Sequence, residues 1–317
     1  MKFAVLMNPL SSLHIKKDTS LAFMASAEAR GWDCFYFTLE HLVCRDGEAY
    51  AFIYQLKNLS NSLDSIQEIA LGMQPLAQFD MILMRQDPPF NLEYIYATYA
   101  LELTEKHGVL VANKPQSLRD MNEKMAILQF PSCCVPTLVT RNLEALHDFW
   151  ASYQQVIFKP LDGMGGRGIF YVDQQGVNLV SILEALTKKG QVSIMAQRFI
   201  PEIKTGGDKR ILLLDGQPVP YALARIPKSG EIRGNLAAGG HGAVVPINAN
   251  DRRICSEIAP MLREKALSFV GIDIIGDYLT EINVTSPTCL REITAATQLD
   301  IAGDYLDLLL QHLKNNP

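Results

Sequence analysis

The sequence lacks the features of several protein classes. Its six cysteines form no CxxC pair and have no histidine at metal-ligand spacing, which argues against a disulfide framework or a zinc site. The net charge is -5 and there is no basic run, which argues against nucleic acid as a partner. No apolar run approaches membrane-spanning length, and residues 1–7 turn polar too early for a signal-peptide core. We therefore expect a soluble cytoplasmic protein with reduced thiols and no membrane partner.

The chain contains enough apolar material for more than one core. At 317 residues it exceeds a typical single core, and its hydrophobic fraction of 48% and charged fraction of 20% are ordinary for globular proteins. We find no internal repeat and no low-complexity tract. Two or three subdomains are expected.

The first 112 residues predict a parallel α/β arrangement. Buried strands are expected at Phe3–Met7, Cys34–Thr38, Phe79–Met84 and Val109–Ala112, separated by helices, with a hairpin around Asp46-Gly47. Ligands of such sheets gather at the carboxyl ends of the strands. The loops 8–17 and 85–90 lie at two such ends, although each loop taken alone is better explained as a plain connection.

The remaining sequence predicts an α+β organisation with antiparallel strands. Residues 113–120 read as extended, and the helix expected after them carries Lys124. Later segments indicate a hairpin over 209–226, a glycine-rich mobile loop over 227–242, and helices near 250–267 and 300–313.

A glycine-rich segment, Leu161 to Gly168, follows a strand that ends in Lys159-Pro160. Gly163, Gly165 and Gly168 match GxGxxG, but a strand follows them where a dinucleotide fold needs a helix. A Walker loop is excluded because no GK[ST] is present, and the kinase HRD and DFG motifs are absent. What remains is a strand–glycine loop–strand flap whose backbone NH groups can cover phosphates. The alternative is a flexible hairpin tip.

Three oxygen-bearing side chains near the carboxyl end predict a metal site. Asp273 interrupts the apolar run from Phe269 to Ile275, and Gly276-Asp277 signals a tight turn. Glu281 and Asn283 are two residues apart on the returning strand, so both project from the same face, where Asp273 can meet them. Such a set suits Mg²⁺ when phosphates supply the remaining oxygens. The alternative is a solvated hairpin with scattered polar residues.

Basic residues form a second candidate group. Lys159 ends a buried strand, and both Lys124 and Lys159 are candidate phosphate partners. Arg210 and Arg225 lie on opposite arms of the 209–226 hairpin, where cross-strand geometry can direct both at one anion. Cross-strand ion pairs with nearby acids, such as Asp208, explain the arginines equally well.

Long motifs along nearly the whole chain resemble the bacterial glutathione synthetase family of the ATP-grasp superfamily. They are Asp87-Pro-Pro-Phe90, Asn113-Lys-Pro-Gln-Ser-Leu-Arg-Asp120, Lys159-Pro-Leu-Asp-Gly-Met-Gly-Gly166, Ala224-Arg-Ile-Pro227, Arg233-Gly-Asn-Leu-Ala-Ala-Gly-Gly240, Asp273-Ile-Ile-Gly276 and Leu279-Thr-Glu-Ile-Asn-Val-Thr-Ser-Pro-Thr288. The resemblance implies an ATP-grasp fold with an N-terminal parallel α/β domain. The implied domains are 1–121, 122–200 and 201–317, with a closing loop over 226–242.

The same resemblance implies ATP-dependent ligation of γ-glutamylcysteine to glycine through an acyl phosphate, giving glutathione, ADP and phosphate. The implied nucleotide contacts are Lys124, Lys159, Gly163, Gly165, Gly166, Gln197, Arg198, Phe199, Ile200 and Asp208. Asp273, Glu281 and Asn283 would bind Mg²⁺ or Mn²⁺, and Asn283 and Ser286 would hold substrate. Arg210, Arg225 and Arg233 would be catalytic, the first two by stabilising the acyl phosphate and the tetrahedral intermediate. Members are commonly homotetramers.

Two positions depart from the family pattern. Gln86 stands where lysine is frequent, and His241 stands where arginine is frequent, so both lower the positive charge beside an anionic substrate. Two other functions use the same fold: a different carboxylate–amine ligase, such as a D-alanine–D-alanine ligase, and a non-catalytic ATP-binding regulatory protein. Only the N-terminal domain and the 227–242 loop argue against the first alternative, because every shared ATP-grasp residue fits it. The metal ligands, both arginines and the closing loop, present together, argue against the second.

Overall fold

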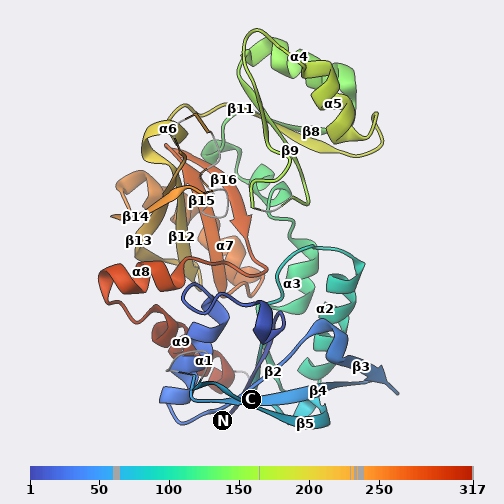
Figure 1. Cartoon of the computed structure of the whole chain (residues 1–317), viewed down its shortest axis with the longest axis vertical. Helices are drawn as coiled ribbons and strands as arrows, with labels where there is room; N and C mark the ends of the chain where they lie inside the picture. Colours follow the sequence, from blue (N-terminus) through green and yellow to red (C-terminus); the bar gives the residue numbers. More distant parts are fainter. Residues whose placement is uncertain (60–64, 164, 229, 232–233, 235–238, 316–317) are drawn as a thin grey trace.

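The structure is a computed structural model that describes residues 1–59, 65–163, 165–228, 230–231, 234 and 239–315. Three sheets organise these residues (Figure 1). A seven-stranded sheet lies at one end of the molecule, a five-stranded sheet lies in the middle, and a small four-stranded sheet lies at the other end.

The first sheet has a parallel centre and an antiparallel extension. Its strands are β1 (Lys2–Leu6), β2 (Asp33–Phe37), β3 (Leu42–Arg45), β4 (Glu48–Lys57), β5 (Gln67–Pro75), β6 (Met81–Met84) and β7 (Leu110–Ala112), in the order β3-β4-β2-β1-β6-β7 with β5 on β4. β2, β1, β6 and β7 pair in parallel. The hairpin around Asp46-Gly47 is therefore confirmed, whereas β5 was not predicted.

Helices that begin at recognisable signals flank this sheet. They are α1 (Thr19–Ala29), α2 (Leu92–Glu105) and α3 (Pro115–Asp120). The Asp18 side chain caps α1 by accepting from Leu21 N, and Asn91 caps α2. The expectation of an extended segment at 113–120 is wrong, because Pro115 occupies the first turn of α3, where its fixed φ favours a helix.

Short 3₁₀ helices complete the connections: η1 (Leu10–Ser12), η2 (Leu39–His41), η4 (Leu76–Gln78), η5 (Met125–Gln129) and η6 (Pro131–Cys133). Lys124 is the residue immediately before η5. The prediction that a helix carries Lys124 is therefore wrong. This short element carries Lys124 between the first sheet and the rest of the chain.

The four-stranded sheet is antiparallel throughout. It consists of β8 (Thr137–Thr140), β9 (Val156–Pro160), β10 (Phe170–Val172) and β11 (Ile194–Arg198), in the order β10-β9-β11-β8, with α4 (Leu143–Tyr153) and α5 (Leu179–Thr187). Its core is a separate cluster that includes Leu146, Phe158 and Leu183. We call this four-stranded sheet together with α4 and α5 the small lobe.

The five-stranded sheet follows the order β14-β13-β12-β15-β16. Its strands are β12 (Asp208–Leu214), β13 (Gln217–Ile226), β14 (His241–Pro246), β15 (Phe269–Ile275) and β16 (Tyr278–Asn283), and the accompanying helices are α6 (Ile203–Gly206), α7 (Ala249–Glu264), α8 (Leu290–Thr297) and α9 (Ile301–Asn315). α8 was not predicted. Residues 226, 241 and 242 belong to strands, so the predicted closing loop is shorter than 226–242, and its residues 229, 232–233 and 235–238 lie outside the described residues.

Strand alternation divides the five-stranded sheet into two faces. Ile211 belongs to the cluster that contains Ile254 and Ile258 of α7, whereas Leu212 belongs to the cluster that contains Leu290 of α8. Since side chains alternate along a strand, Arg210 lies on the same face as Leu212. Both clusters also contain residues of the first sheet, so the two large sheets share their core. Among the described residues, no helix is long and apolar enough to cross a membrane.

Candidate active site

A cavity of about 470 Å³ lies where the three sheets meet. Every predicted site residue that the structure describes lines it. These are Lys124, Lys159, Gly163, Gly165, Gly166, Gln197, Arg198, Phe199, Ile200, Asp208, Arg210, Arg225, Asp273, Glu281, Asn283 and Ser286. Arg233 lies outside the described residues. Segments that are far apart in the sequence thus meet at one place.

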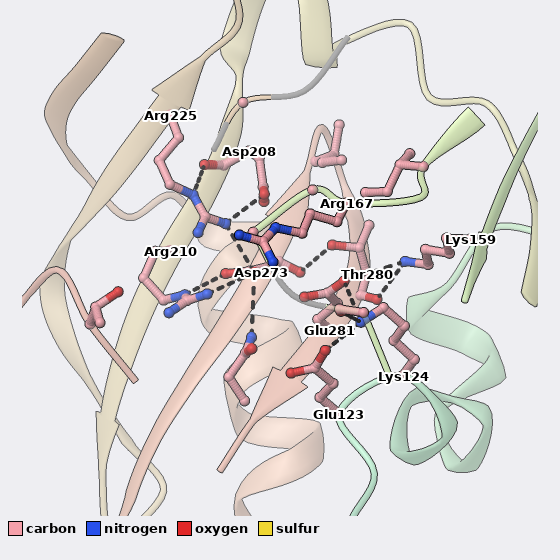
Figure 2. Close-up of a pocket in the computed structure, with 18 of the residues that line it drawn as sticks. Glu123, Lys124, Lys159, Arg167, Asp208, Arg210, Arg225, Asp273, Thr280 and Glu281 are labelled. Carbon is pink, nitrogen blue, oxygen red and sulfur yellow. Dashed lines mark hydrogen bonds and ion pairs between the residues drawn. The ribbon is translucent and has the colours of Figure 1, made fainter. Parts of the chain in front are cut away.

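Asp273 is the centre of one charged group in this cavity (Figure 2). Arg210 binds it through two bonds, Nε to Oδ1 at 2.5 Å and Nη2 to Oδ2 at 2.9 Å. Arg225 Nη2 lies 2.9 Å from Asp273 Oδ2 and 2.5 Å from Asp208 Oδ2. The two arginines therefore converge as predicted, and the anion they meet within the chain is Asp273. The alternative of cross-strand ion pairs is also realised here.

Strand register explains this convergence. Arg210 is the β-sheet partner of Asp273, and Asp208 is the partner of Arg225. A Cβ at Gly271 would lie 2.9 Å from Arg210 Cδ, so the glycine leaves room for the arginine stem. This last contact could not be predicted from local sequence, because it depends on the neighbouring strand.

The electrostatics of the group follow from burial and charge. Burial opposes the ionised form of Asp273, but Arg210 and Arg225 outweigh it and hold the pKa of that carboxyl well below its usual range. Burial raises the pKa of Asp208 to about 7, despite the nearby Arg225. Asp208 Oδ1 is buried and accepts no hydrogen bond from the part of the chain described. The group can therefore accept one further donor or cation.

Glu281 is the centre of a second charged group. Its Oε1 lies 3.5 Å from Lys124 Nζ and 3.7 Å from Lys159 Nζ. Lys124 also pairs with Glu123 and donates to Gly163 O at 2.8 Å. Figure 2 shows both lysines pointing toward Glu281. The sequence reading missed Glu123, which is adjacent to Lys124 in the chain.

The two lysines differ in their surroundings. Burial lowers the pKa of Lys159, because the charged form loses its hydration. Burial acts the same way on Lys124, but Glu281 and Glu123 outweigh it and raise its pKa. Both are buried lysines that point into a cavity, which is the geometry of an anion-binding pair and not of solvated surface residues.

The glycine-rich segment connects two paired strands, as predicted. β9 and β10 pair antiparallel, with Phe158 opposite Phe170, and the segment between them borders the cavity. Gly165, Gly166 and Gly168 have positive φ, which glycine adopts without strain. The segment is thus a strand–glycine loop–strand hairpin whose backbone faces the lysines. Residue 164 lies outside the described residues.

Residues 197–200 form another part of the cavity wall. Gln197 belongs to β11 and donates to Thr137 Oγ1 at 3.1 Å, while Phe199 and Ile200 are buried just after the strand. This segment offers an apolar surface and backbone polar groups to the cavity.

A polar network borders the cavity at Asp87 and Ser286. Asp87 accepts from Asn8 Nδ2 at 3.0 Å and from Ser286 Oγ. Gln86 donates to Asn8 Oδ1 and is not among the described residues that line the cavity. His241 is exposed at the start of β14. The motif at 87–90 had drawn attention to Asp87 without giving it a role.

Arg85 connects the first sheet to the loop that carries Ser286. It is buried, its guanidinium lies 5.9 Å from the Phe23 ring and 5.5 Å from the Phe269 ring, and its Nη2 donates to Pro287 O at 2.8 Å. Arginine is suited to such stacking between aromatic rings. The sequence reading missed this residue too.

The candidate metal ligands lie on one face of two paired strands. Asp273 is the partner of Glu281, and Asn283 Nδ2 donates to Asp273 Oδ2 at 3.3 Å, which leaves the Asn283 carbonyl oxygen available. Asp273 Oδ1 accepts from Arg210 alone among the described residues and keeps acceptor capacity. The oxygen donors fit Mg²⁺. The described residues contain no cluster of three or more His, Cys, Asp or Glu side chains able to hold a metal, so phosphate oxygens would have to complete the site.

Comparisons with known proteins agree with this arrangement. Residues 1–119 match the family model for the prokaryotic glutathione synthetase N-terminal domain, and residues 123–298 match that for the prokaryotic glutathione synthetase ATP-grasp domain. A glutathione synthetase of Pseudomonas putida is 52% identical over 99% of this chain and 98% of its own. The chain belongs to the prokaryotic glutathione synthetase family. It is an ATP-dependent ligase.

Solved structures share the fold at much lower sequence identity. D-cycloserine synthetase DcsG matches with a TM-score of 0.69 at 14% identity, covering 98% of this chain and 99% of its own. The ATP-grasp ligase PsnB, solved with a minimal precursor, Mg and ADP, matches with a TM-score of 0.62 at 17% identity over 99% of this chain and 98% of its own. These likenesses confirm the ATP-grasp fold.

Proposed function

We propose that the chain joins γ-glutamylcysteine to glycine with ATP, through an acyl phosphate, and releases glutathione, ADP and phosphate. One observation carries this proposal: two arginines and two lysines meet Asp273 and Glu281 in one cavity beneath a glycine hairpin. The cations suit a phosphate and a carboxylate held side by side, and the acids would hold a divalent metal ion. Family membership supports the choice of substrates.

The nucleotide lies between the small lobe and the five-stranded sheet. Lys124, Lys159 and the backbone of Gly163, Gly165 and Gly166 hold its phosphates, as the glycine hairpin and the lysine pair both border the cavity. The segment 197–200, with Arg198 exposed to the cavity, holds the adenine, and Asp208 contributes a polar contact. The apolar wall of Phe199 and Ile200 supports the adenine assignment.

Asp273, Glu281 and Asn283 would hold Mg²⁺, or Mn²⁺ in its place, and the ion would supply charge neutralisation for the transferring phosphoryl group. When the nucleotide binds, its phosphates neutralise the lysines and arginines. The ion pairs of Asp273 and Glu281 with these cations then weaken, which frees carboxylate oxygens for the metal. The solved complex of PsnB with Mg and ADP supports a metal–nucleotide pair in this fold.

The reaction has two steps at Arg210 and Arg225. The cysteinyl carboxylate attacks the γ-phosphate of ATP, ADP leaves, and the glycine amine then attacks the acyl phosphate and displaces phosphate. Both arginines stabilise the negative charge of the acyl phosphate and of the tetrahedral intermediate. Arg233, which lies outside the described residues, is assigned a catalytic role by resemblance to the family, and Asn283 and Ser286 hold the dipeptide. The positions of Arg210 and Arg225, both buried and aimed into the cavity, support these roles.

The domains divide near residues 121 and 200, giving 1–121, 122–200 and 201–317. The family matches at 1–119 and 123–298 and the separate core of the small lobe support these boundaries. The protein acts in the cytoplasm as a homotetramer, by resemblance to its family, and its six cysteines are free thiols.

The test is release of phosphate from ATP with alternative substrates. Phosphate release is expected with γ-glutamylcysteine plus glycine and not with D-alanine. Release with D-alanine alone would indicate a D-alanine–D-alanine type of ligase. Tight ATP binding without any release would indicate a regulatory protein of the same fold.

A further inference from the structure

One arginine of the cavity has no partner within the described part of the chain. Arg167 lines the cavity and is exposed, and its side chain makes no hydrogen bond or ion pair with any described residue. It stands between Gly166 and Gly168 in the glycine hairpin, and both glycines have positive φ. Its side chain extends from the hairpin toward the group around Asp273 (Figure 2). The phosphate contacts proposed above use the backbone of this hairpin and leave Arg167 without a role.

Four other cations of the cavity already have acidic partners. The pairs are Arg210 with Asp273, Arg225 with Asp208 and Asp273, Lys124 with Glu123 and Glu281, and Lys159 with Glu281. Arg198 donates to the Tyr278 hydroxyl at 3.5 Å and lies over the ring of that residue at 5.8 Å. Lys17 is exposed like Arg167, but it belongs to the loop before α1. Arg167 is therefore the cation of the glycine hairpin that can bind an incoming anion without first giving up an ion pair within the described residues.

Arg167 points toward the place where phosphoryl transfer is proposed. The lysines and the hairpin backbone are proposed to hold the phosphates, and Arg210 and Arg225 are proposed to meet the reacting carboxylate. A side chain that extends from the hairpin toward Asp273 (Figure 2) therefore meets the terminal phosphate, which lies between these two sets of contacts. A guanidinium suits this ligand, because its planar set of N–H donors matches phosphate oxygens.

We propose that Arg167 binds the γ-phosphate of ATP and makes the cavity favour ATP over ADP. This inference rests on the nucleotide placement given under the proposed function. ATP carries one phosphate group that ADP lacks, so a cation at that position strengthens binding of the triphosphate and not of the diphosphate. The side chain thus adds nucleotide specificity to a hairpin whose backbone binds any polyphosphate.

Nucleotide affinities of Arg167→Gln test this inference without turnover. Isothermal titration calorimetry gives the dissociation constants of ADP and of the non-hydrolysable ATP analogue AMPPNP, each with Mg²⁺. The variant should bind AMPPNP about 10-fold more weakly than the wild-type protein does, because one charge-assisted hydrogen bond is lost. Its affinity for ADP should stay within about twofold. Arg167→Lys should lose less AMPPNP affinity, because lysine keeps the charge without the planar set of donors.

Two further arginines of the small lobe provide controls. Arg198→Gln changes a cation in the segment proposed to hold the adenine, so it should weaken AMPPNP and ADP binding by the same factor. Arg141→Gln, at an exposed position between β8 and α4, should change neither affinity, because Arg141 is not among the described residues that line the cavity. Both Arg167 variants should fold as the wild-type protein does, since the side chain is exposed, and circular dichroism checks this.

The outcomes separate this inference from the proposed function. Equal weakening of AMPPNP and ADP binding by Arg167→Gln would mean that Arg167 meets a phosphate common to both nucleotides, and it would overturn the inference. Unchanged binding of both nucleotides would overturn it as well. Absence of glutathione formation by the wild-type protein would overturn the proposed reaction, while the comparison of AMPPNP with ADP would still decide the role of Arg167. A wild-type protein that bound neither nucleotide would overturn both.

Discussion

The five-stranded sheet and the small lobe line the same cavity with different kinds of groups. The sheet presents charged side chains fixed by ion pairs, as between Arg210 and Asp273. The small lobe presents glycine backbone, an apolar wall that includes Phe199 and Ile200, and the buried Lys159, while its arginines at the cavity, Arg167 and Arg198, are not buried. The sheet also shares its core with the first sheet, whereas the lobe has a core of its own. The oriented charges therefore lie on the five-stranded sheet, and the part that covers the cavity is the small lobe with its separate core.

This difference separates two tasks. Charges that stabilise a transition state work best when they are already oriented, and the paired strands of the sheet provide that. A cover over a nucleotide must open and close, and a lobe with its own core can move as a unit. Changes in the sheet should therefore act on turnover, and changes in the lobe should act on nucleotide binding.

The largest effect is expected for Glu281→Gln. The change removes the acid that faces both lysines and is proposed to bind Mg²⁺. Turnover of Mg²⁺–ATP should fall by about 100- to 1,000-fold, as for loss of one preorganised charge. Steady-state kinetics with saturating substrates measure this fall in kcat. Glu264→Gln, the same change at an exposed position of α7, is the control and should leave kcat unchanged. A near-normal kcat would contradict the metal assignment.

Arg225→Ala should lower kcat by about 100-fold and raise KM less, because the proposed role lies in the transition state. The variant should also unfold more easily, by about 3–5 kcal/mol, since Asp208 and Asp273 lose a buried partner. Kinetics below the unfolding temperature separate the two effects. An increase in KM at constant kcat would make Arg225 a ground-state binder instead.

Leu146→Ala should weaken the small lobe with a lesser effect on turnover. Leu146 is fully buried in the separate core, and its truncation should cost about 2–5 kcal/mol. Hydrogen exchange should speed up in β8–β11 while the five-stranded sheet keeps its protection, and the KM for ATP should rise. Leu262→Ala, in the core shared by the large sheets, is the control. If Leu146→Ala increased hydrogen exchange equally in the small lobe and in the five-stranded sheet, the lobe would not be an independently stable unit.

The smallest effect concerns the thiols. Cys289 lines the cavity, but it is buried, and burial raises its pKa despite Arg210 and Arg225. Below pH 8 it should stay protonated and react slowly with iodoacetamide, while exposed Cys44 reacts first without loss of activity. The Cys289 rate should increase as pH rises toward its pKa. Mass spectrometry of the alkylated peptides measures the order, and faster alkylation of Cys289 than of Cys44 would contradict it.

Much of this arrangement could be predicted from local patterns. The turn at Gly276-Asp277 and the spacing of Glu281 and Asn283 placed three oxygen donors on one face, as the structure confirms. The strand–glycine–strand hairpin followed from the residues after Gly168. Such features depend on a few adjacent residues and on strand periodicity.

Features that depend on distant partners could not be predicted. β5 is almost entirely exposed, so no burial pattern marks it. α8 begins after Cys289, which has a φ of 82° and makes no side-chain cap. Glu292 lines a cavity that three regions of the chain form together, and its Oε2 is buried there without a hydrogen-bond partner among the described residues. Contacts of this kind arise from tertiary packing and leave no local signal.

Arg85 and Asn113 have a consequence for how the molecule can move. Arg85 donates to Pro287 O, and Asn113 donates to Phe269 O and Val284 O, so side chains of the first sheet hold the backbone on either side of β15 and β16. The loop with Ser286 therefore travels with the N-terminal part of the chain. The dipeptide that we propose to bind at Ser286 would therefore keep its place beside the first sheet while the small lobe, which has its own core, moves over the nucleotide.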